Sequence, residues 1–170
     1  MAKGKPSTRS TVKAALKAWK VPPTRLQYGA LCYRRTGKGK IRVMLITSRR
    51  TRRWISPKGW PINGLRPAET AAREAWEEAG VRGRVAAHSI GFYPYQKYIG
   101  RGRSVTCLVQ LFPLEVTARA EKFPEAGERK VRWFKPAKAA KRVREPQLAR
   151  LIRDLPQLLE QRAEREAAEP

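Results

Sequence analysis

Runs of apolar residues, separated by glycine, proline and charged stretches, predict a mixture of strands and helices. Strands are favoured where Val, Ile, Leu and Tyr are concentrated between turn residues, which occurs at 27–33, 41–48, 81–87, 89–95, 103–116 and 131–134. The Gly-Lys-Gly-Lys stretch at 37–40 predicts a hairpin turn, and Ile-Gly-Arg-Gly at 99–102 predicts a second. Strands and helices that mix without regular alternation indicate an α/β or α+β domain with a mixed sheet.

Three segments are predicted to be helical. The first begins at Pro67, a residue favoured in the first turn, and ends at Gly80, a residue typical of a helix C-terminus. Glu69 is placed so that its side chain reaches back to the N-terminal amides. The others are expected at 136–143 and 147–168, and Pro156 within the last predicts a kink or a division into two helices.

The remaining segments predict the domain limits. Residues 54–64 contain prolines and glycines that exclude a regular helix and indicate a structured loop. Pro22 and Pro23 indicate a boundary, so we expect a basic tail at 1–24, one domain at 25–160, and a helix end or tail at 161–170.

Composition narrows the class of protein. The chain has 170 residues and is 41% hydrophobic, which suits one folded domain, and no apolar run approaches the roughly 20 residues of a membrane span. Cys32 and Cys107 lie in apolar runs without metal-ligand spacing, so we expect buried thiols. The N-terminus lacks the apolar segment of a secretory signal; its composition also fits a transit peptide, but we favour a solvated tail and a cytoplasmic location.

The net charge of +24 predicts a polyanionic partner. No Asp or Glu precedes Glu69, so the N-terminal part of the chain carries only positive charge. A surface of this kind attracts nucleic acid, polyphosphates or acidic membranes. Charge alone is equally consistent with a solubilising surface or with nonspecific RNA binding.

Three glutamates share one face of the first predicted helix. Glu74, Glu77 and Glu78 stand at i, i+3 and i+4, where like charges repel one another and destabilise the helix. A hard divalent cation removes the repulsion, because Mg²⁺ prefers carboxylate, water and phosphate oxygens. Arg73 is placed to brace the cluster from one residue upstream. The pattern therefore predicts a magnesium site rather than a solvated acidic face.

The same stretch resembles the Nudix box. That box is Gly, five residues, Glu, seven residues, Arg-Glu, an aliphatic residue, any residue, Glu-Glu, any residue, Gly and an aliphatic residue. The chain has Gly59 and then Arg-Glu-Ala-Trp-Glu-Glu-Ala-Gly-Val at 73–81, with every spacing correct. One position departs, because Leu65 stands where the family has its first glutamate; we expect this to alter the loop more than the metal site, with Glu69 taking over helix capping.

The resemblance to the Nudix (MutT-like) family implies a fold and a reaction. It implies an α/β/α sandwich with a mixed sheet and hydrolysis of a pyrophosphate linkage by metal-activated water, with Mg²⁺ or Mn²⁺ as cofactor. The implied metal ligands are Glu74, Glu77, Glu78 and the Gly59 carbonyl, with Glu78 indispensable. Glu77, Arg73 and Glu128, or Glu125 from the same loop, are the further catalytic candidates.

Sequence similarity outside the box indicates a class of substrate. The Trp-x-x-Pro-Lys-Gly entry and the 130–135 segment resemble the branch that hydrolyses diphosphoinositol polyphosphates and diadenosine polyphosphates, whose substrates are strongly anionic. Guanidinium groups suit phosphate oxygens, and exposed aromatic rings suit bases. The predicted substrate-binding residues are Lys58, Arg50, Arg101, Arg103 and Trp60. Two alternatives stay open: an RNA-binding module that uses the basic surface, and an RNA 5′-end pyrophosphohydrolase.

Overall fold

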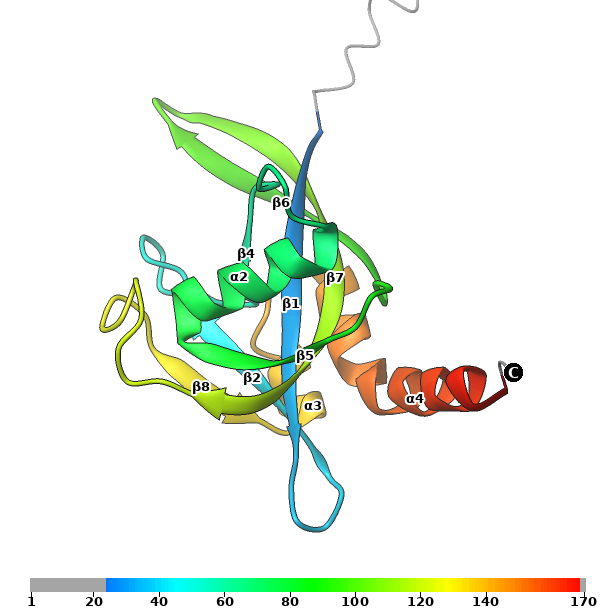
Figure 1. The fold of residues 1–170 in the computed structure, drawn as a ribbon. Coiled ribbons are helices and arrows are strands. Elements are labelled where there is room, and N and C mark those ends of the chain that lie inside the picture. The colour runs from blue at the N-terminus through cyan, green and yellow to red at the C-terminus, as the bar shows by residue number, and fades with distance from the viewer. Residues whose placement is uncertain (1–23, 169–170) are drawn as a thin grey trace, which may run out of the picture.

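The computed structural model describes residues 24–168, which form a mixed β-sheet with helices on both faces (Figure 1). The α/β/α arrangement with a mixed sheet is confirmed. The strands are β1 (Arg25–Arg35), β2 (Ile41–Thr47), β3 (Trp54–Ile55), β4 (Lys58–Gly59), β5 (Val81–Val85), β6 (Gly91–Gly100), β7 (Arg103–Arg119) and β8 (Val131–Phe134). The helices are α2 (Pro67–Ala79), α3 (Pro136–Ala140) and α4 (Pro146–Ala168).

Strands β1 and β7 hold the sheet together. They pair in parallel from Arg25 opposite Cys107 to Tyr33 opposite Glu115, and the other pairings are antiparallel. β2 and β4 pair with β1, β5 and β6 pair with β7, and β3 and β8 pair with β2. The short strand β4, which holds the first glycine of the box, is thereby attached to the centre of the sheet.

Each face of the sheet has its own hydrophobic core. Side chains alternate along a strand, so Leu31 and Tyr33 of β1 pack toward α3 and α4, whereas Ala30 and Cys32 pack toward α2. The side of α2 that meets the sheet consists of small residues, which are Ala68, Ala71, Ala75 and Ala79. These alanines bring the helix close to the sheet and leave its charged residues at the edge.

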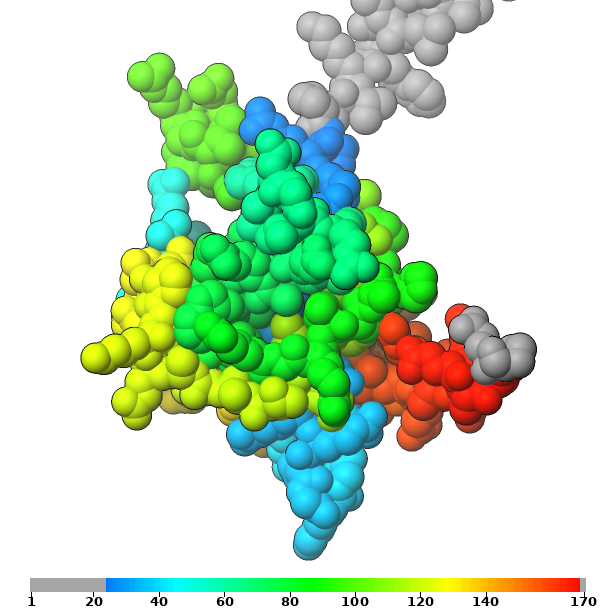
Figure 2. Space-filling model, viewed as in Figure 1, coloured from blue at the N-terminus to red at the C-terminus, as the bar shows by residue number. Residues whose placement is uncertain are grey.

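The hairpin of β6 and β7 is longer than the sequence predicts. β6 continues to Gly100 because the two strands pair from Gly91 opposite Leu111 to Gly100 opposite Arg103. The expected turn at 99–102 is thereby reduced to two residues. The hairpin extends beyond the body of the molecule in Figures 1 and 2.

Other boundaries also differ from the expectation. The expected loop at 54–64 contains two short strands, because β3 and β4 pair with β2 and β1. β5 ends at Val85, and α3 ends at Ala140. α4 remains helical through Pro156 to Ala168, so division into two helices is wrong, and residues 161–168 belong to this helix. The predicted tail lies almost entirely in 1–23, outside the described residues.

Burial agrees with the expectation for the cysteines. Cys32 and Cys107 are both fully buried free thiols. Within residues 24–168, no helix combines the length and the apolar character needed to cross a bilayer.

Candidate active site

Both ends of α2 are fixed by local interactions. At the N-terminus the Arg66 amide donates to Glu69 Oε2 at 2.8 Å, so the expected capping by Glu69 is confirmed. At the C-terminus Gly80 adopts φ 67° and its amide donates to Trp76 O at 2.9 Å. Leu65, which replaces the family's first glutamate, is 39% exposed. The helix therefore keeps its ends defined without a carboxylate at position 65.

Glu74 lies against the backbone of Gly59. A Cβ built on Gly59 would stand 2.0 Å from Glu74 Oε1, a distance that no side chain tolerates. Burial and the neighbouring Glu77 and Glu125 raise the pKa of the Glu74 carboxyl above its usual range. The absence of a side chain at Gly59 thus lets one carboxylate of α2 reach β4.

Glu78 is the most buried of the three glutamates. Its side chain is 10% exposed, Oε1 lies 3.3 Å from Arg129 Nη2, and the buried Oε2 has no hydrogen-bond partner among the described residues. Burial raises the pKa of Glu78 to about 7, although the positive charges of Lys58 and Arg129 oppose that rise. A buried carboxylate oxygen without a donor is costly unless a cation neutralises it.

Glu77 occupies the outer side of the cluster. Arg73 Nε donates to Glu77 Oε1 at 2.8 Å across one turn of the helix. The predicted bracing by Arg73 therefore acts on Glu77, whose side chain is 36% exposed. The Glu77 carbonyl also accepts from the Glu125 amide at 3.0 Å, which attaches the loop at 120–130 to α2.

Arg129 is a site residue that the sequence did not single out. Its side chain is 7% exposed and contacts Glu78, Glu125 at 2.8 Å and the carbonyl of Thr47 at 3.1 Å. In a chain with 38 Lys and Arg residues, nothing local distinguishes this arginine. Its burial arises because the 120–130 loop folds back over the end of α2, where Phe123 packs on Trp76.

Two acids of that loop differ in position. Glu125 forms an ion pair with Arg129, and its negative charge contributes to the raised pKa of both Glu74 and Glu78. Glu128, the catalytic candidate from the sequence, lies further out and pairs with Arg49 at 3.2 Å. The structure thus places Glu125 closer to the cluster than Glu128, and the catalytic role of Glu128 remains a prediction.

The cluster suits a magnesium ion that is completed by water and substrate. Within residues 24–168, no three acidic, histidine or cysteine side chains converge at metal-binding distance. Mg²⁺ needs no such cage, because it is usually bound by one or two carboxylates together with water and substrate phosphate oxygens. Glu74 and Glu78 supply carboxylates with raised pKa values, and the buried Glu78 Oε2 lacks a partner. The residues present therefore fit the implied metal.

A second polar cluster lies on the other face of the sheet, at the start of α4. Arg53 forms an ion pair with Glu145, and both side chains are largely buried. Lys58 Nζ lies 4.9 Å from the centre of the Tyr95 ring, and burial lowers the pKa of Lys58 to about 8. The negative charges of Glu78 and Glu145 oppose this lowering of the Lys58 pKa. Lys58 thus links the two clusters.

Glu145 is distinguished in the sequence by its isolation from other acids. It is the only acid between Glu128 and Asp154, directly before the Pro146 that begins α4. Glu145 Oε2 is buried and has no partner within the described residues. The neighbouring hydroxyls of Tyr93 and Ser56 are 2.9 Å apart, and Tyr95 donates to Gln27 at 2.5 Å.

The predicted substrate-binding residues gather around β6. Arg50 lies over Tyr98 at 4.8 Å, and Lys97 lies over Trp60 at 4.6 Å. Arg101 forms the turn of the hairpin with φ 51°, and Arg103 begins β7. Lys58 is within reach of the charge of Glu78, whereas Arg101 and Arg103 belong to the turn of the hairpin, which projects from the body of the molecule (Figure 1).

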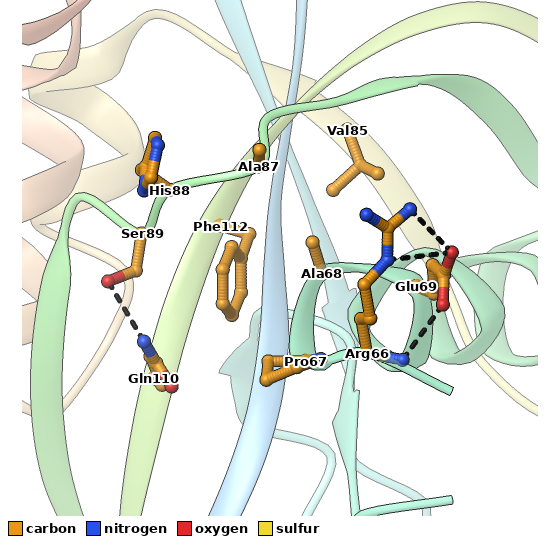
Figure 3. A pocket seen from close by; sticks show the side chains of 10 residues that line it. All are labelled: Arg66, Pro67, Ala68, Glu69, Val85, Ala87, His88, Ser89, Gln110 and Phe112. Carbon is orange, nitrogen blue, oxygen red and sulfur yellow. Dashed lines mark hydrogen bonds and ion pairs between the residues drawn. The ribbon is translucent and has the colours of Figure 1, made fainter. Parts of the chain in front are cut away.

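A separate hollow of about 510 Å³ lies at the other end of α2 (Figure 3). Arg66, Glu69 and His88 contribute to its lining, with Phe112 between the walls. Its one carboxylate is already bound by Arg66, and Glu69 is roughly 13 Å along the helix from Glu78. His88 lies in the connection between β5 and β6, as a loop residue. This hollow is not part of the carboxylate cluster.

Comparisons with known proteins agree with this geometry. The model of the NUDIX domain matches residues 24–155. The chain is 29% identical over 102 residues to Nudix hydrolase 13, mitochondrial, of Arabidopsis thaliana, covering 57% of this chain and 50% of that protein. It is 33% identical over 103 residues to Nudix hydrolase 21, chloroplastic, of the same plant, covering 59% and 50%.

The chain thus spans about half the length of these two relatives. Among solved structures, an Ap4A hydrolase binary complex from C. elegans aligns with a TM-score of 0.59 and 22% identity, over 80% of this chain and 98% of that one. At this identity the likeness concerns the fold.

Proposed function

The chain belongs to the Nudix family, and on that basis we propose that it is a magnesium-dependent pyrophosphohydrolase of highly anionic substrates. The substrates we propose are diadenosine polyphosphates or diphosphoinositol polyphosphates, and Mn²⁺ is an alternative cofactor. The observation that carries the proposal is Glu74 against the Gly59 backbone together with Glu78, which lies one turn further along α2 and has one buried oxygen without a partner among residues 24–168. We keep the cytoplasmic location as a prediction.

Glu74, Glu78 and the Gly59 carbonyl would hold the metal, with Glu77 at its outer side. A bound Mg²⁺ neutralises phosphate oxygens and lowers the pKa of water. Arg129 supports the site from behind, because its guanidinium fixes Glu78 Oε1 and leaves Oε2 free. Gly59 excludes any side chain from the space that Glu74 enters. The protein's part is therefore to hold the carboxylates in place before the ion and substrate arrive.

Positively charged side chains near the carboxylate cluster favour a substrate with many negative charges. Lys58 lies within reach of the charges of both Glu78 and Glu145, so an ammonium group stands between the metal site and the second polar cluster. Arg53 is oriented beside it by Glu145. A polyphosphate bound at the metal would have the positive charge of Lys58 beside its phosphates.

A hydrolysis screen tests the proposal. Diadenosine polyphosphates, diphosphoinositol polyphosphates, nucleoside triphosphates, ADP-ribose and 5′-triphosphorylated RNA are incubated with Mg²⁺, and Glu78→Gln serves as the blank. We expect magnesium-dependent turnover with a preference for one of the first two classes. Turnover that the Glu78→Gln enzyme matches would refute the metal site, and preference for triphosphorylated RNA would favour the alternative substrate class.

A further inference from the structure

Three contacts between a cation and an aromatic ring connect β6 to three other segments. They link it to β4, to the loop that follows β4, and to the connection between β2 and β3. The pairs are Lys58 with Tyr95 at 4.9 Å, Lys97 with Trp60 at 4.6 Å, and Arg50 with Tyr98 at 4.8 Å. Aromatic rings and positive charges therefore accompany β6 from the active site toward the end of the hairpin, and Lys97 and Tyr98, as consecutive residues of the strand, lie on its two opposite faces.

Two of these rings are open to solvent. Trp60 is 39% exposed and Tyr98 is 49% exposed, and the adjoining Ile99 is 43% exposed. The hydroxyl of Tyr98 accepts from the Gly102 amide at 3.3 Å, which ties this ring to the turn of the hairpin. A ring that is held in place and still exposed loses little conformational entropy when a flat partner stacks on it.

The positive charge of this region is not balanced by acids. No Asp or Glu occurs between Glu78 and Glu115 or before Glu69, so the hairpin and the loop after β4 carry none. Within residues 24–168 the side chains of Arg50, Lys97 and Arg101 form no ion pair. Their charges are therefore available to anions, and Figure 2 displays the hairpin standing clear of the body of the molecule.

We propose that the free edge of β6, a strand that pairs only with β7 among the described strands, binds single-stranded polynucleotide through a hairpin surface that comprises Lys97 and Trp60 on one face, Tyr98 and Arg50 on the other, and Arg101 and Arg103 at the turn. Exposed rings stack on unpaired bases while adjacent cations contact the backbone phosphates. In a duplex the faces of the bases are stacked on one another and cannot contact the aromatic rings. A ligand that consists only of phosphates has no flat group to stack on these rings. This binding needs no pyrophosphate linkage, so it goes beyond the proposed hydrolysis.

The dimensions of the hairpin agree with a polymer. From Tyr95, beside Lys58, to the turn at Arg101 the strand rises roughly 20 Å. Charges on one strand of nucleic acid recur every ~3.4 Å along a stacked helix, so several nucleotides fit along that length. A polynucleotide on this surface would have one end directed at the carboxylate cluster.

The test is a binding titration with the full chain and a fluorescent RNA of about 12 nucleotides that carries a 5′-hydroxyl. This probe has no linkage to hydrolyse, so its result is independent of whether the chain is a hydrolase. We expect Tyr98→Ala to weaken binding by roughly 5- to 100-fold, Trp60→Ala to act similarly, and Tyr98→Phe to retain affinity because the ring remains. Thermal melting of each variant verifies that it is folded.

A second arm separates stacking from charge. Arg101→Ala with Arg103→Ala removes two cations, so the slope of log affinity against log salt should fall by about 1.4. The matched control is Lys38→Ala with Lys40→Ala, which removes two cations from the hairpin turn between β1 and β2 and should change affinity much less. Equal binding of the corresponding duplex, unchanged binding by Tyr98→Ala, or an equal loss in the control would overturn the proposal and leave only nonspecific attraction.

Discussion

The carboxylate cluster of α2 and the hairpin surface occupy opposite physical environments. At the centre of the cluster, Glu78 and Arg129 are both buried and form an ion pair with each other. On the hairpin surface, charged groups such as Arg101 are exposed and lie among rings and other cations. Buried charges interact strongly because the local dielectric is low, whereas exposed charges are screened by water and salt.

This difference determines how large an effect a substitution in each region should have. Single substitutions in the cluster should alter turnover or stability by large factors, because they leave a buried group without its partner. Single substitutions on the hairpin surface should alter affinity by small factors that depend on salt. Four predictions test that contrast, beginning with the largest expected effect.

The largest effect is expected for Glu78→Gln. The amide has the same shape but cannot neutralise a cation, so turnover should fall by roughly 10²- to 10³-fold or more. Stability should not fall, because the substitution also removes a charge that burial disfavours. Steady-state kinetics and thermal unfolding measure the two quantities. Normal turnover in this variant would contradict the assigned metal site.

Arg129→Met should destabilise the fold more than any substitution on the hairpin surface. It leaves Glu78 and Glu125 without their shared buried cation, and breaking a buried pair in this way costs about 3–5 kcal/mol. Denaturant titration measures the free energy of unfolding. Arg132→Met, one exposed position on β8, is the control and should change it by less than about 0.5 kcal/mol. Similar values for both would mean that Arg129 is dispensable.

Gly59→Ala should raise the Mg²⁺ concentration that turnover requires. The new methyl group would occupy the place of the Glu74 carboxylate, which must then rotate away from β4. We expect the Mg²⁺ concentration for half-maximal turnover to rise by roughly 10-fold, with a smaller change in stability. Gly37→Ala, in an open turn with nothing near its Cβ, is the control. An unchanged magnesium dependence would show that Glu74 does not contribute to the site.

The smallest effect is expected for Arg101→Ala combined with Arg103→Ala. Because both are exposed, the variant should raise KM by roughly 2- to 10-fold and leave kcat nearly unchanged. The rise should be greater for the most phosphorylated substrates than for a sugar nucleotide, and should shrink at high salt. Equal rises for both substrates would identify these residues as surface charges without a part in recognition.

Much of the fold followed from local patterns. The helix from Pro67 to Ala79 agrees with the prediction because its start, its cap and its final glycine are all encoded within a few residues. The length of β6 was not predicted, because the segment 96–100 joins the strand only through its pairing with β7, in which Ile99 is skipped at an irregularity. The continuity of α4 through Pro156 was likewise undecided by sequence, since packing of Ile152, Leu155 and Leu159 on the sheet stabilises the helix on both sides.

The sequence by itself determined the family, the three glutamates on one helical face and the excess of positive charge, because spacing and composition are properties of the chain. The tertiary structure decided which cations those glutamates contact. Arg129 is one of many cations in the sequence and Glu145 is marked there only by its isolation from other acids, and each acquires its place only when a loop or helix start folds against a distant strand. Burial, which gives these charges their strength, depends on contacts between segments far apart in the chain and so cannot be determined from local sequence.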